Sequence, residues 1–368
     1  MTQLQTIVVV GGSYAGTWIV DQLAPHVHRT HNVVLIEKNS HMQHLFMFPR
    51  ISVVAGFTEK AFIPYTNAFH GAPPYSTSIV QGVVSAVLPD RVVLESGRSI
   101  CYDYLVMATG TGALPLELTT KQENVTSKLT LQERIRIARD VVVVGGGAYG
   151  IQLAFDTKEV YPSKNVTLVH SREQLMPRFH PRLHSIVVDR AITLGVTVIL
   201  GHRVKVPFGG FPNSGQPFGV ELADGRCIPA DVAVSCIGGT PLSSPLLALS
   251  PTSVDPKSKL IRVKPTLQIV DPLFPRIFAI GDVAETGAHN AAGPAHRQAE
   301  VAARNIARMI AGESPTIYVP AIHKIRLSLG LHFYVVFENP EDGKTRMYEC
   351  RVQRVWARRA PGVTDYRL

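Results

Sequence analysis

The chain has no long apolar run, no closely spaced cysteine pair and no block of basic residues. No apolar stretch approaches the length of about 18 residues that suggests a membrane-spanning helix. No Lys/Arg run of five occurs, so the net charge of +9 predicts a solvated basic surface with anion-binding pockets and no nucleic-acid partner. The cysteines show no Cys-x-x-Cys pair and no zinc spacing, which argues against a dithiol relay and a metal site: Cys101, Cys227, Cys236 and Cys350.

What the chain does contain is typical of a well-packed protein of two or three domains. Its 368 residues are 45% hydrophobic and 18% charged, which argues against a disordered chain. The first strand is expected near Thr6, which predicts no secretory signal, and Thr2 stands where N-myristoylation needs glycine. We therefore expect a cytoplasmic protein, with peripheral attachment to an intracellular membrane as the alternative.

Two glycine-rich turns of the same kind occur in this chain, at residues 11–16 and 145–150. Each follows a β-branched apolar run and leads into a helix-like stretch. Such a turn brings the backbone close to a pyrophosphate, which rests on the N-terminus of the helix. Two of them in tandem predict a protein that holds two dinucleotides and passes electrons between them.

The strand predicted after the first turn, residues 33–37, ends in an acid. Glu37 lies 21 residues beyond Gly16, where a carboxylate can accept both hydroxyls of an adenosine ribose. The alternative is an ordinary solvated glutamate, and the spacing favours the ribose role.

The corresponding strand of the second unit, residues 166–169, is followed by His170-Ser171-Arg172, with no acid before Glu173. Arg172 can pair with a 2′-phosphate and Ser171 can donate to it. The sequence therefore predicts that NADPH is accepted at least as well as NADH. In the alternative, Arg172 points into solvent.

Strands ending in small residues recur further along the chain. Residues 103–110 and 230–239 mirror each other, and residues 275–283 form another buried strand that ends in Gly-Asp. The remaining predicted elements are a β-meander at 82–107, helices at 120–139 and 294–311, and a hairpin with strands at 332–337 and 347–352 around a turn at 339–343.

The order of these motifs resembles that of two-dinucleotide-binding flavoproteins built like glutathione reductase. The elements are the two turns, Ala108-Thr109-Gly110 and Ile280-Gly281-Asp282. Residues 49–65 and 161–171 are similar to the apoptosis-inducing-factor-like, mitochondria-associated branch, the AMID or ferroptosis-suppressor flavoproteins. The resemblance implies an α/β fold with two Rossmann-like domains and a small C-terminal α+β piece.

The same resemblance implies an FAD-dependent oxidoreductase that takes a hydride from NADPH or NADH and reduces a quinone-like acceptor. Two alternatives stay open. One is a flavoprotein oxidase or dehydrogenase of a small molecule, and the other is a redox-responsive flavoprotein with little turnover. The sequence identifies neither the acceptor nor the oligomeric state.

The resemblance also implies where the cofactors bind. An FAD domain would comprise residues 1–112 and 239–311, an NAD(P)H domain residues 113–238, and a C-terminal domain residues 312–368. Asp282 would hold a ribityl hydroxyl or a pyrophosphate-linked group, Arg50 would neutralise the pyrophosphate, and Val84 would offer main-chain groups to adenine. The implied FAD residues are Gly11, Gly12, Ser13, Tyr14, Ala15, Gly16, Glu37, Arg50, Val84, Thr109, Gly110, Gly281 and Asp282, and the nicotinamide-dinucleotide residues are Gly145, Gly147, Gly150, His170, Ser171 and Arg172.

Three features depart from the family pattern. Ser13 replaces the middle glycine of the first turn, and its hydroxyl can donate to phosphate. Gln152 stands where the family usually has a glutamate beside the nicotinamide, which would weaken or retune nicotinamide binding. The segment beyond about residue 330 does not follow the family. No catalytic residue and no metal ligand is assigned, and His41, His44 and His289 are expected to be structural.

Overall fold

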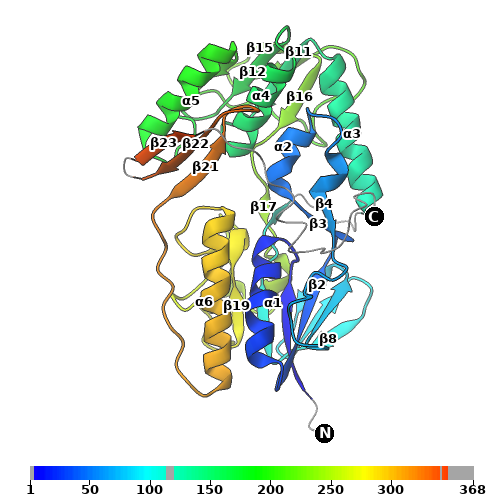
Figure 1. Cartoon of the computed structure of the whole chain (residues 1–368), viewed down its shortest axis with the longest axis vertical. Helices are drawn as coiled ribbons and strands as arrows, with labels where there is room; N and C mark the ends of the chain where they lie inside the picture. Colours follow the sequence, from blue (N-terminus) through cyan, green and yellow to red (C-terminus); the bar gives the residue numbers. More distant parts are fainter. Residues whose placement is uncertain (1–3, 113–119, 340–341, 347–368) are drawn as a thin grey trace.

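The computed structural model describes residues 4–112, 120–339 and 342–346 (Figure 1). Its first dinucleotide-binding unit is built on a five-stranded parallel sheet with the strand order β19-β9-β1-β2-β5. Helices α1 (Tyr14–Val27) and α6 (Ala292–Ile310) lie side by side against this sheet (Figure 1). The strands are β1 (Gln5–Val10), β2 (His31–Glu37), β5 (Thr77–Gln81), β9 (Tyr104–Met107) and β19 (Ile277–Ala279).

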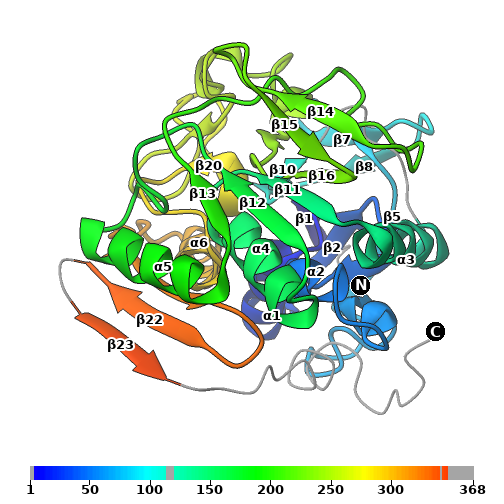
Figure 2. The same ribbon diagram turned by 90° about the horizontal axis from the view of Figure 1, so that it is seen from above.

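The second unit repeats the plan with a four-stranded parallel sheet in the order β13-β12-β11-β16. Figure 2 shows α4 and α5 lying beside this sheet. Helix α3 begins with a capping box in which Thr120 and Glu123 bond each other's backbone N–H. The elements are β11 (Asp140–Val144), β12 (Asn165–Val169), β13 (Thr197–Ile199), β16 (Val232–Ser235), α3 (Lys121–Ile137), α4 (Ala148–Val160) and α5 (Pro181–Leu194).

Apolar residues of the two first strands make the centre of each core. Val8, Val9 and Val143 have no exposed surface, and the neighbouring valines are nearly as buried. Strands covered on both faces are expected to read as continuous apolar runs, as these do. None of the described helices is both long and apolar enough to cross a membrane.

Short elements connect and extend the two units. The chain passes between the units through an antiparallel pair of two-residue strands, β10 (Thr111–Gly112) and β17 (Thr240–Pro241). The others are β3 (His41–Gln43), β4 (Phe62–Pro64), β6 (Val84–Val87), β7 (Arg91–Leu94), β8 (Ser99–Cys101), β14 (Phe218–Glu221), β15 (Cys227–Ala230), β18 (Ile261–Arg262), β20 (Ala284–Glu285), α2 (Phe48–Ile51), and the 3-10 turns η1 (Leu45–Met47), η2 (Thr58–Ala61), η3 (Ser244–Leu246), η4 (Pro251–Ser253) and η5 (Gly281–Val283).

The described part of the C-terminal segment is an antiparallel sheet of β21 (Lys324–Ser328), β22 (Tyr334–Glu338) and β23 (Asp342–Arg346). The predicted hairpin is present, but its turn is tighter than expected, because Glu338 pairs directly with Asp342. The returning strand therefore starts five residues earlier than predicted. The predicted strand at 347–352 lies outside the described residues. Val335 and Phe337 of β22 pack into the core of the second unit.

Candidate active site

The first glycine-rich turn connects β1 to α1 and is too crowded for larger residues. Gly11 has a φ of +105°, and a Cβ added there would lie 2.3 Å from the Ala108 carbonyl oxygen. A Cβ on Gly16 would lie 1.7 Å from the Gly11 oxygen. Ser13 precedes α1 without a side-chain capping bond, and the first turn of α1 holds no acid. The backbone N–H groups there remain available to an anion.

Glu37 closes this turn from the end of β2. Its Oε2 accepts the Gly12 N–H at 2.5 Å, and its Oε1 accepts the backbone and side-chain N–H groups of Asn39 at 2.8 and 2.7 Å. Tyr65, which the sequence did not single out, donates its hydroxyl to the Gly12 carbonyl at 2.8 Å. It lies 53 residues along the chain, and no local pattern marks it.

A cavity of about 60 Å³ opens beside Glu37. The structure brings Gly11, Glu37, Val84 and Thr109 together around it, although they come from four separate segments. This cradle fits the adenosine side of a dinucleotide, because the turn admits no Cβ and a carboxylate stands at the strand end. Leu242 and Pro245, from the segment that returns from the second unit, also line it.

Asp282 follows β19 and is the acidic residue of the predicted Gly-Asp motif. Burial raises the pKa of its carboxyl, and the positive charge of Arg178 opposes that rise. The backbone N–H of Gly281 donates to Gln298 Oε1 on α6 at 2.7 Å. Gln298 is 3% exposed and fixes the position of the loop that carries Asp282. Sequence reasoning missed Gln298, because it looks like one polar residue in an amphipathic helix.

Tyr14 and His44 form a buried pair next to the first turn. Tyr14 Oη and His44 Nδ1 lie 2.5 Å apart. Burial lowers the pKa of His44 to about 4 and raises the pKa of Tyr14 above its ordinary value. Near neutral pH both side chains are therefore uncharged, and a neutral hydrogen bond joins them. This arrangement is consistent with the structural role expected for His44.

The second glycine-rich turn repeats the geometry of the first. Gly145 has a φ of +124°, and a Cβ there would lie 2.4 Å from the Cys236 carbonyl oxygen. A Cβ on Gly150 would lie 1.9 Å from the Gly145 oxygen. Gly147 caps the N-terminus of α4, whose first turn also lacks an acid. The turn is therefore equally suited to a pyrophosphate.

His170 occupies the place in the second unit that Glu37 occupies in the first. The Gly146 N–H donates to His170 Nδ1 at 3.1 Å. Burial lowers the pKa of His170, and the charge of Arg172 adds to this effect. The imidazole is therefore neutral, with Nδ1 as acceptor. Ser171 and Arg172 follow it and are exposed, in the loop where the sequence placed them.

Arg50 has partners other than the expected pyrophosphate. Its Nε donates to Asp156 Oδ2 on α4 at 2.6 Å, and its Nη2 donates to Ser328 Oγ at 3.1 Å and to the Gly330 carbonyl at 2.9 Å. The guanidinium thus connects α2, α4 and the end of β21. A buried carboxylate of the second unit thus holds the guanidinium here, and the contact of Arg50 with the FAD pyrophosphate stays a prediction.

The hinge between the two units carries the remaining predicted residues. The Thr109 hydroxyl donates to the Leu242 carbonyl at 2.7 Å, and the Leu242 N–H donates to the Gly110 carbonyl at 3.0 Å. These bonds hold the outgoing and returning segments together at the carboxyl end of β9, where Thr109 also lines the cavity.

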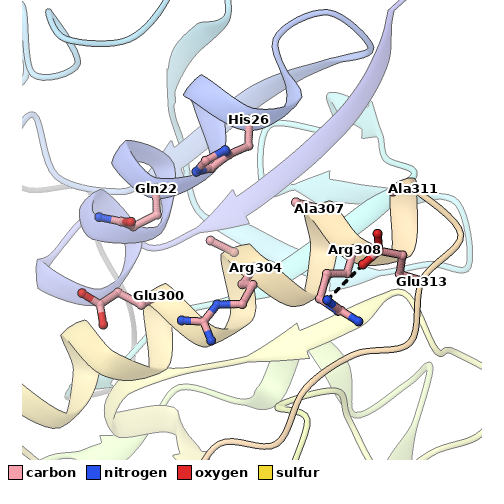
Figure 3. A pocket seen from close by; sticks show the side chains of 9 residues that line it. Gln22, His26, Glu300, Arg304, Ala307, Arg308, Ala311 and Glu313 are labelled. Atoms are coloured by element: carbon pink, nitrogen blue, oxygen red, sulfur yellow. Dashed lines mark ion pairs between the residues drawn. The ribbon is translucent and has the colours of Figure 1, made fainter.

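A larger hollow lies elsewhere. It measures about 670 Å³ and runs along the C-terminal halves of α1 and α6 (Figure 3). Its lining includes Gln22, His26, Glu300 and Arg304, and none of the predicted site residues. We therefore place the chemistry at the two glycine turns.

A pair of dinucleotide-binding units, each with a glycine-rich turn and the first with an acid at the ribose position, defines a flavin- and pyridine-nucleotide-dependent oxidoreductase. Residues 5–304 match the pyridine nucleotide-disulphide oxidoreductase family, and the chain belongs to that family. The match confirms the predicted fold class and the predicted class of enzyme, with FAD and NAD(P)H as its cofactors.

Similar proteins are found among relatives and solved structures. The chain is 38% identical over 360 residues to Fe-regulated protein 8 of Mycosarcoma maydis, covering 89% of this chain and 87% of that protein. It is 30% identical over 336 residues to ferroptosis suppressor protein 1 of Xenopus laevis, with coverages of 88% and 86%. These matches confirm the predicted branch.

The fold is shared with the sulfide:quinone oxidoreductase of Aquifex aeolicus. The TM-score is 0.75 at 18% identity, covering 96% of this chain and 89% of that one. At this identity the likeness establishes the fold alone.

Proposed function

We propose that this protein transfers two electrons from NAD(P)H, through FAD, to a quinone-like acceptor. The observation that carries the proposal is the pair of matching turns with different closing residues, Glu37 in one and His170 in the other. When bound, FAD supplies the ring that accepts the hydride and later releases the electrons. The acceptor class follows from the resemblance to the ferroptosis-suppressor branch.

The chain's own residues bind and orient the two dinucleotides. The N-termini of α1 and α4 would stabilise the two pyrophosphates, and Glu37 would accept the hydroxyls of the FAD ribose. Asp282 lies half-buried after β19, where it would accept a hydrogen bond from bound FAD. We propose that the FAD unit comprises residues 1–112 and 239–311, and the NAD(P)H unit residues 113–238.

Electrons would pass between the bound rings without a thiol relay. The sequence has no Cys-x-x-Cys pair, and within the described ranges Cys101, Cys227 and Cys236 are free thiols. Burial raises the pKa of Cys236 to about 12, so this thiol stays protonated and unreactive.

Anaerobic titration of the purified protein with NADPH and NADH tests the proposal. The flavin absorbance should bleach with either donor and return on addition of a soluble quinone. Rapid reoxidation by oxygen alone would favour an oxidase, and a flavin that neither donor bleaches would favour a binding protein with little turnover.

We further propose that the protein contacts a membrane peripherally. The segment between α6 and β21 exposes three aliphatic side chains, Ile317, Val319 and Ile322, which are 67%, 74% and 60% accessible. Exposed apolar groups of this kind can insert into a lipid surface. Co-sedimentation with anionic vesicles should fall when all three residues are changed to serine. Unchanged co-sedimentation would show that this segment does not contact the membrane.

A further inference from the structure

The hollow between α1 and α6 takes no part in the proposed redox chemistry. Its volume of about 670 Å³ lies within the range of about 300–1,000 Å³ that is typical of ligand pockets. Figure 3 shows side chains of both helices around it, Gln22 and His26 from α1 and Glu300 and Arg304 from α6. Three further lining residues have short side chains that leave the space open: Ala303, Ala307 and Ala311.

Two opposite charges of α6 border this hollow, and neither has a permanently charged partner among the described residues. Arg304 makes no hydrogen bond and no ion pair there, whereas the neighbouring Arg308 pairs with Glu313 at 2.9 Å (Figure 3). Glu300 Oε1 lies 3.6 Å from His296 Nε2, which is an ion pair only when the imidazole is protonated. Glu300 and Arg304 lie one helical turn apart, where a mutual ion pair contributes little to stability. A ligand that carries both charges can therefore displace that pair.

These charges are complementary to a zwitterion that has a phosphate and an ammonium group a few bonds apart. The planar guanidinium of Arg304 matches a phosphate, and the side chains of Gln22 and His26 offer further N–H donors from α1. The carboxylate of Glu300 accepts hydrogen bonds from a primary ammonium group. A trimethylammonium group has no N–H donor and is usually bound by aromatic rings, but no Phe, Tyr or Trp occurs among the described residues that line the hollow. The chemistry therefore favours phosphoethanolamine over phosphocholine.

The exposed aliphatic segment after α6 is fixed to the same part of that helix. Asp- and Glu-free hydrogen bonds hold it, because the buried Asn305 accepts the Thr316 N–H at 2.7 Å and donates to the Thr316 carbonyl at 2.8 Å. Tyr318 packs into the core of the first unit, while its neighbours Ile317 and Val319 are exposed. The charged hollow and these apolar side chains therefore lie at the same end of α6.

We propose that the hollow binds the headgroup of a phosphatidylethanolamine lipid, with Arg304 on the phosphate and Glu300 on the ammonium group, while Ile317 and Val319 enter the apolar layer. This inference rests on the proposed membrane contact. The source is a lipid and not a soluble headgroup, because the exposed aliphatic side chains beside the hollow need an apolar partner. The site selects a membrane by its headgroup as well as by its surface charge.

Co-sedimentation with three kinds of vesicle tests the headgroup site. The vesicles consist of phosphatidylcholine alone, phosphatidylcholine with phosphatidylethanolamine, and phosphatidylcholine with phosphatidylglycerol. All three present phosphates, but only the second presents a primary ammonium group at zero net charge. The wild type should bind the phosphatidylethanolamine vesicles about two- to fivefold more tightly than those of phosphatidylcholine alone, the range expected for one exposed ion pair.

Variants of the two charges should have different effects. Glu300→Gln should remove the preference for phosphatidylethanolamine and strengthen binding to phosphatidylglycerol vesicles, because a carboxylate that repels the anionic headgroup is lost. Arg304→Gln should weaken binding to all three vesicles about two- to fivefold, and Arg304→Lys should recover part of the loss. A change in bilayer packing caused by phosphatidylethanolamine would act on every variant alike.

Matched controls remove the same charges elsewhere on the surface. Glu133→Gln on α3 and Arg98→Gln before β8 change exposed residues that do not line the hollow, and both should leave the ratio between phosphatidylethanolamine and phosphatidylcholine vesicles unchanged. Flavin content should stay at the wild-type level in all variants, which shows that they fold.

The outcomes separate the headgroup site from the membrane contact on which it rests. A wild type that binds none of the vesicles would overturn the membrane contact itself. A wild type that binds all three alike, or a preference that survives Glu300→Gln, would overturn only the headgroup site. Calorimetric binding of soluble glycerophosphoethanolamine that depends on Arg304 and Glu300, without any preference among vesicles, would overturn the assignment to a lipid.

Discussion

The two glycine-rich turns have nearly the same backbone, but different side chains close them. In both turns a backbone N–H donates to the residue that ends or follows the second strand, from Gly12 to Glu37 and from Gly146 to His170. The first acceptor is a carboxylate and the second is a neutral imidazole beside Arg172. The two turns therefore share one backbone geometry, whereas the acceptors at their strand ends differ in charge.

The helices that follow the turns differ as well. The numbering of the two units is offset by 134, from Gly11 to Gly145, so Trp18 and Gln22 of α1 correspond to Gln152 and Asp156 of α4. The helix in the first unit thus carries no buried carboxylate at this place, whereas the helix in the second carries one paired with Arg50. In the second unit this carboxylate joins α4 to α2 of the first unit through Arg50.

Alanine at the last glycine of each turn should disrupt the two units separately, and this is the largest expected effect. In Gly16→Ala the new Cβ would meet the Gly11 oxygen, and in Gly150→Ala it would meet the Gly145 oxygen. Such overpacking costs about 1–3 kcal/mol or more. Gly16→Ala should purify colourless. Gly150→Ala should stay yellow but fail to bleach with NADPH.

Gly71→Ala is the control, because a Cβ there meets nothing within 4 Å. A Gly150→Ala protein that loses its flavin, or a Gly16→Ala protein that keeps it, would show that the two sites are assigned to the wrong units.

Removal of the Asp282 side chain should weaken FAD binding and leave the second turn unaffected. A hydrogen bond to a charged group contributes about 1.5–3 kcal/mol, which is about ten- to a hundredfold in affinity. Equilibrium dialysis of Asp282→Ala, followed by flavin fluorescence of the released fraction, measures this loss. Full flavin occupancy after dialysis would show that Asp282 does not contribute to FAD binding.

Arg172→Ala tests whether the strand end of the second unit reads the 2′-phosphate. The KM for NADPH should rise about tenfold, because a charge-assisted bond is lost, while the KM for NADH should change little. Steady-state kinetics with both donors decides the point. A wild type that strongly prefers NADH, with a preference that the substitution leaves alone, would refute this role for Arg172.

The buried carboxylate of α4 should give the second unit a small pH dependence of stability. The pKa of Asp156 lies above its ordinary value of 3.8, at about 6, so the folded state binds this proton more tightly than the unfolded chain does. The contribution of Asp156 to the free energy of unfolding therefore increases as the pH falls from 6 toward 4, by up to about 1.4 kcal/mol per pH unit.

Denaturant unfolding of the wild type and Asp156→Asn at pH 7 and pH 5 measures this. The wild type should gain relative to the variant at the lower pH. A constant difference between the two proteins would show that the Asp156 pKa is ordinary in the folded state.

Short-range patterns predicted most of the elements, because periodicity and turn chemistry are local. The strands predicted at 33–37 and 166–169 lie within two residues of their observed bounds, His31–Glu37 and Asn165–Val169. The C-terminal hairpin was predicted with a wider turn, because Asn339-Pro340 marks a turn but does not set the register. Its second strand is set by pairing with β22.

The sequence alone determined the fold class, the two glycine-rich turns, the position of Glu37 at the end of a strand and the absence of a dithiol motif. Each of these depends on residues that are close together in the chain. Only the tertiary structure decided that Arg50 pairs with Asp156, that Tyr65 and Gln298 support the first site, and that His170 bonds the second turn. These contacts join residues from 17 to 106 positions apart. Which residues form these contacts depends on how the two sheets and the C-terminal strands pack, and no local sequence pattern predicts that packing.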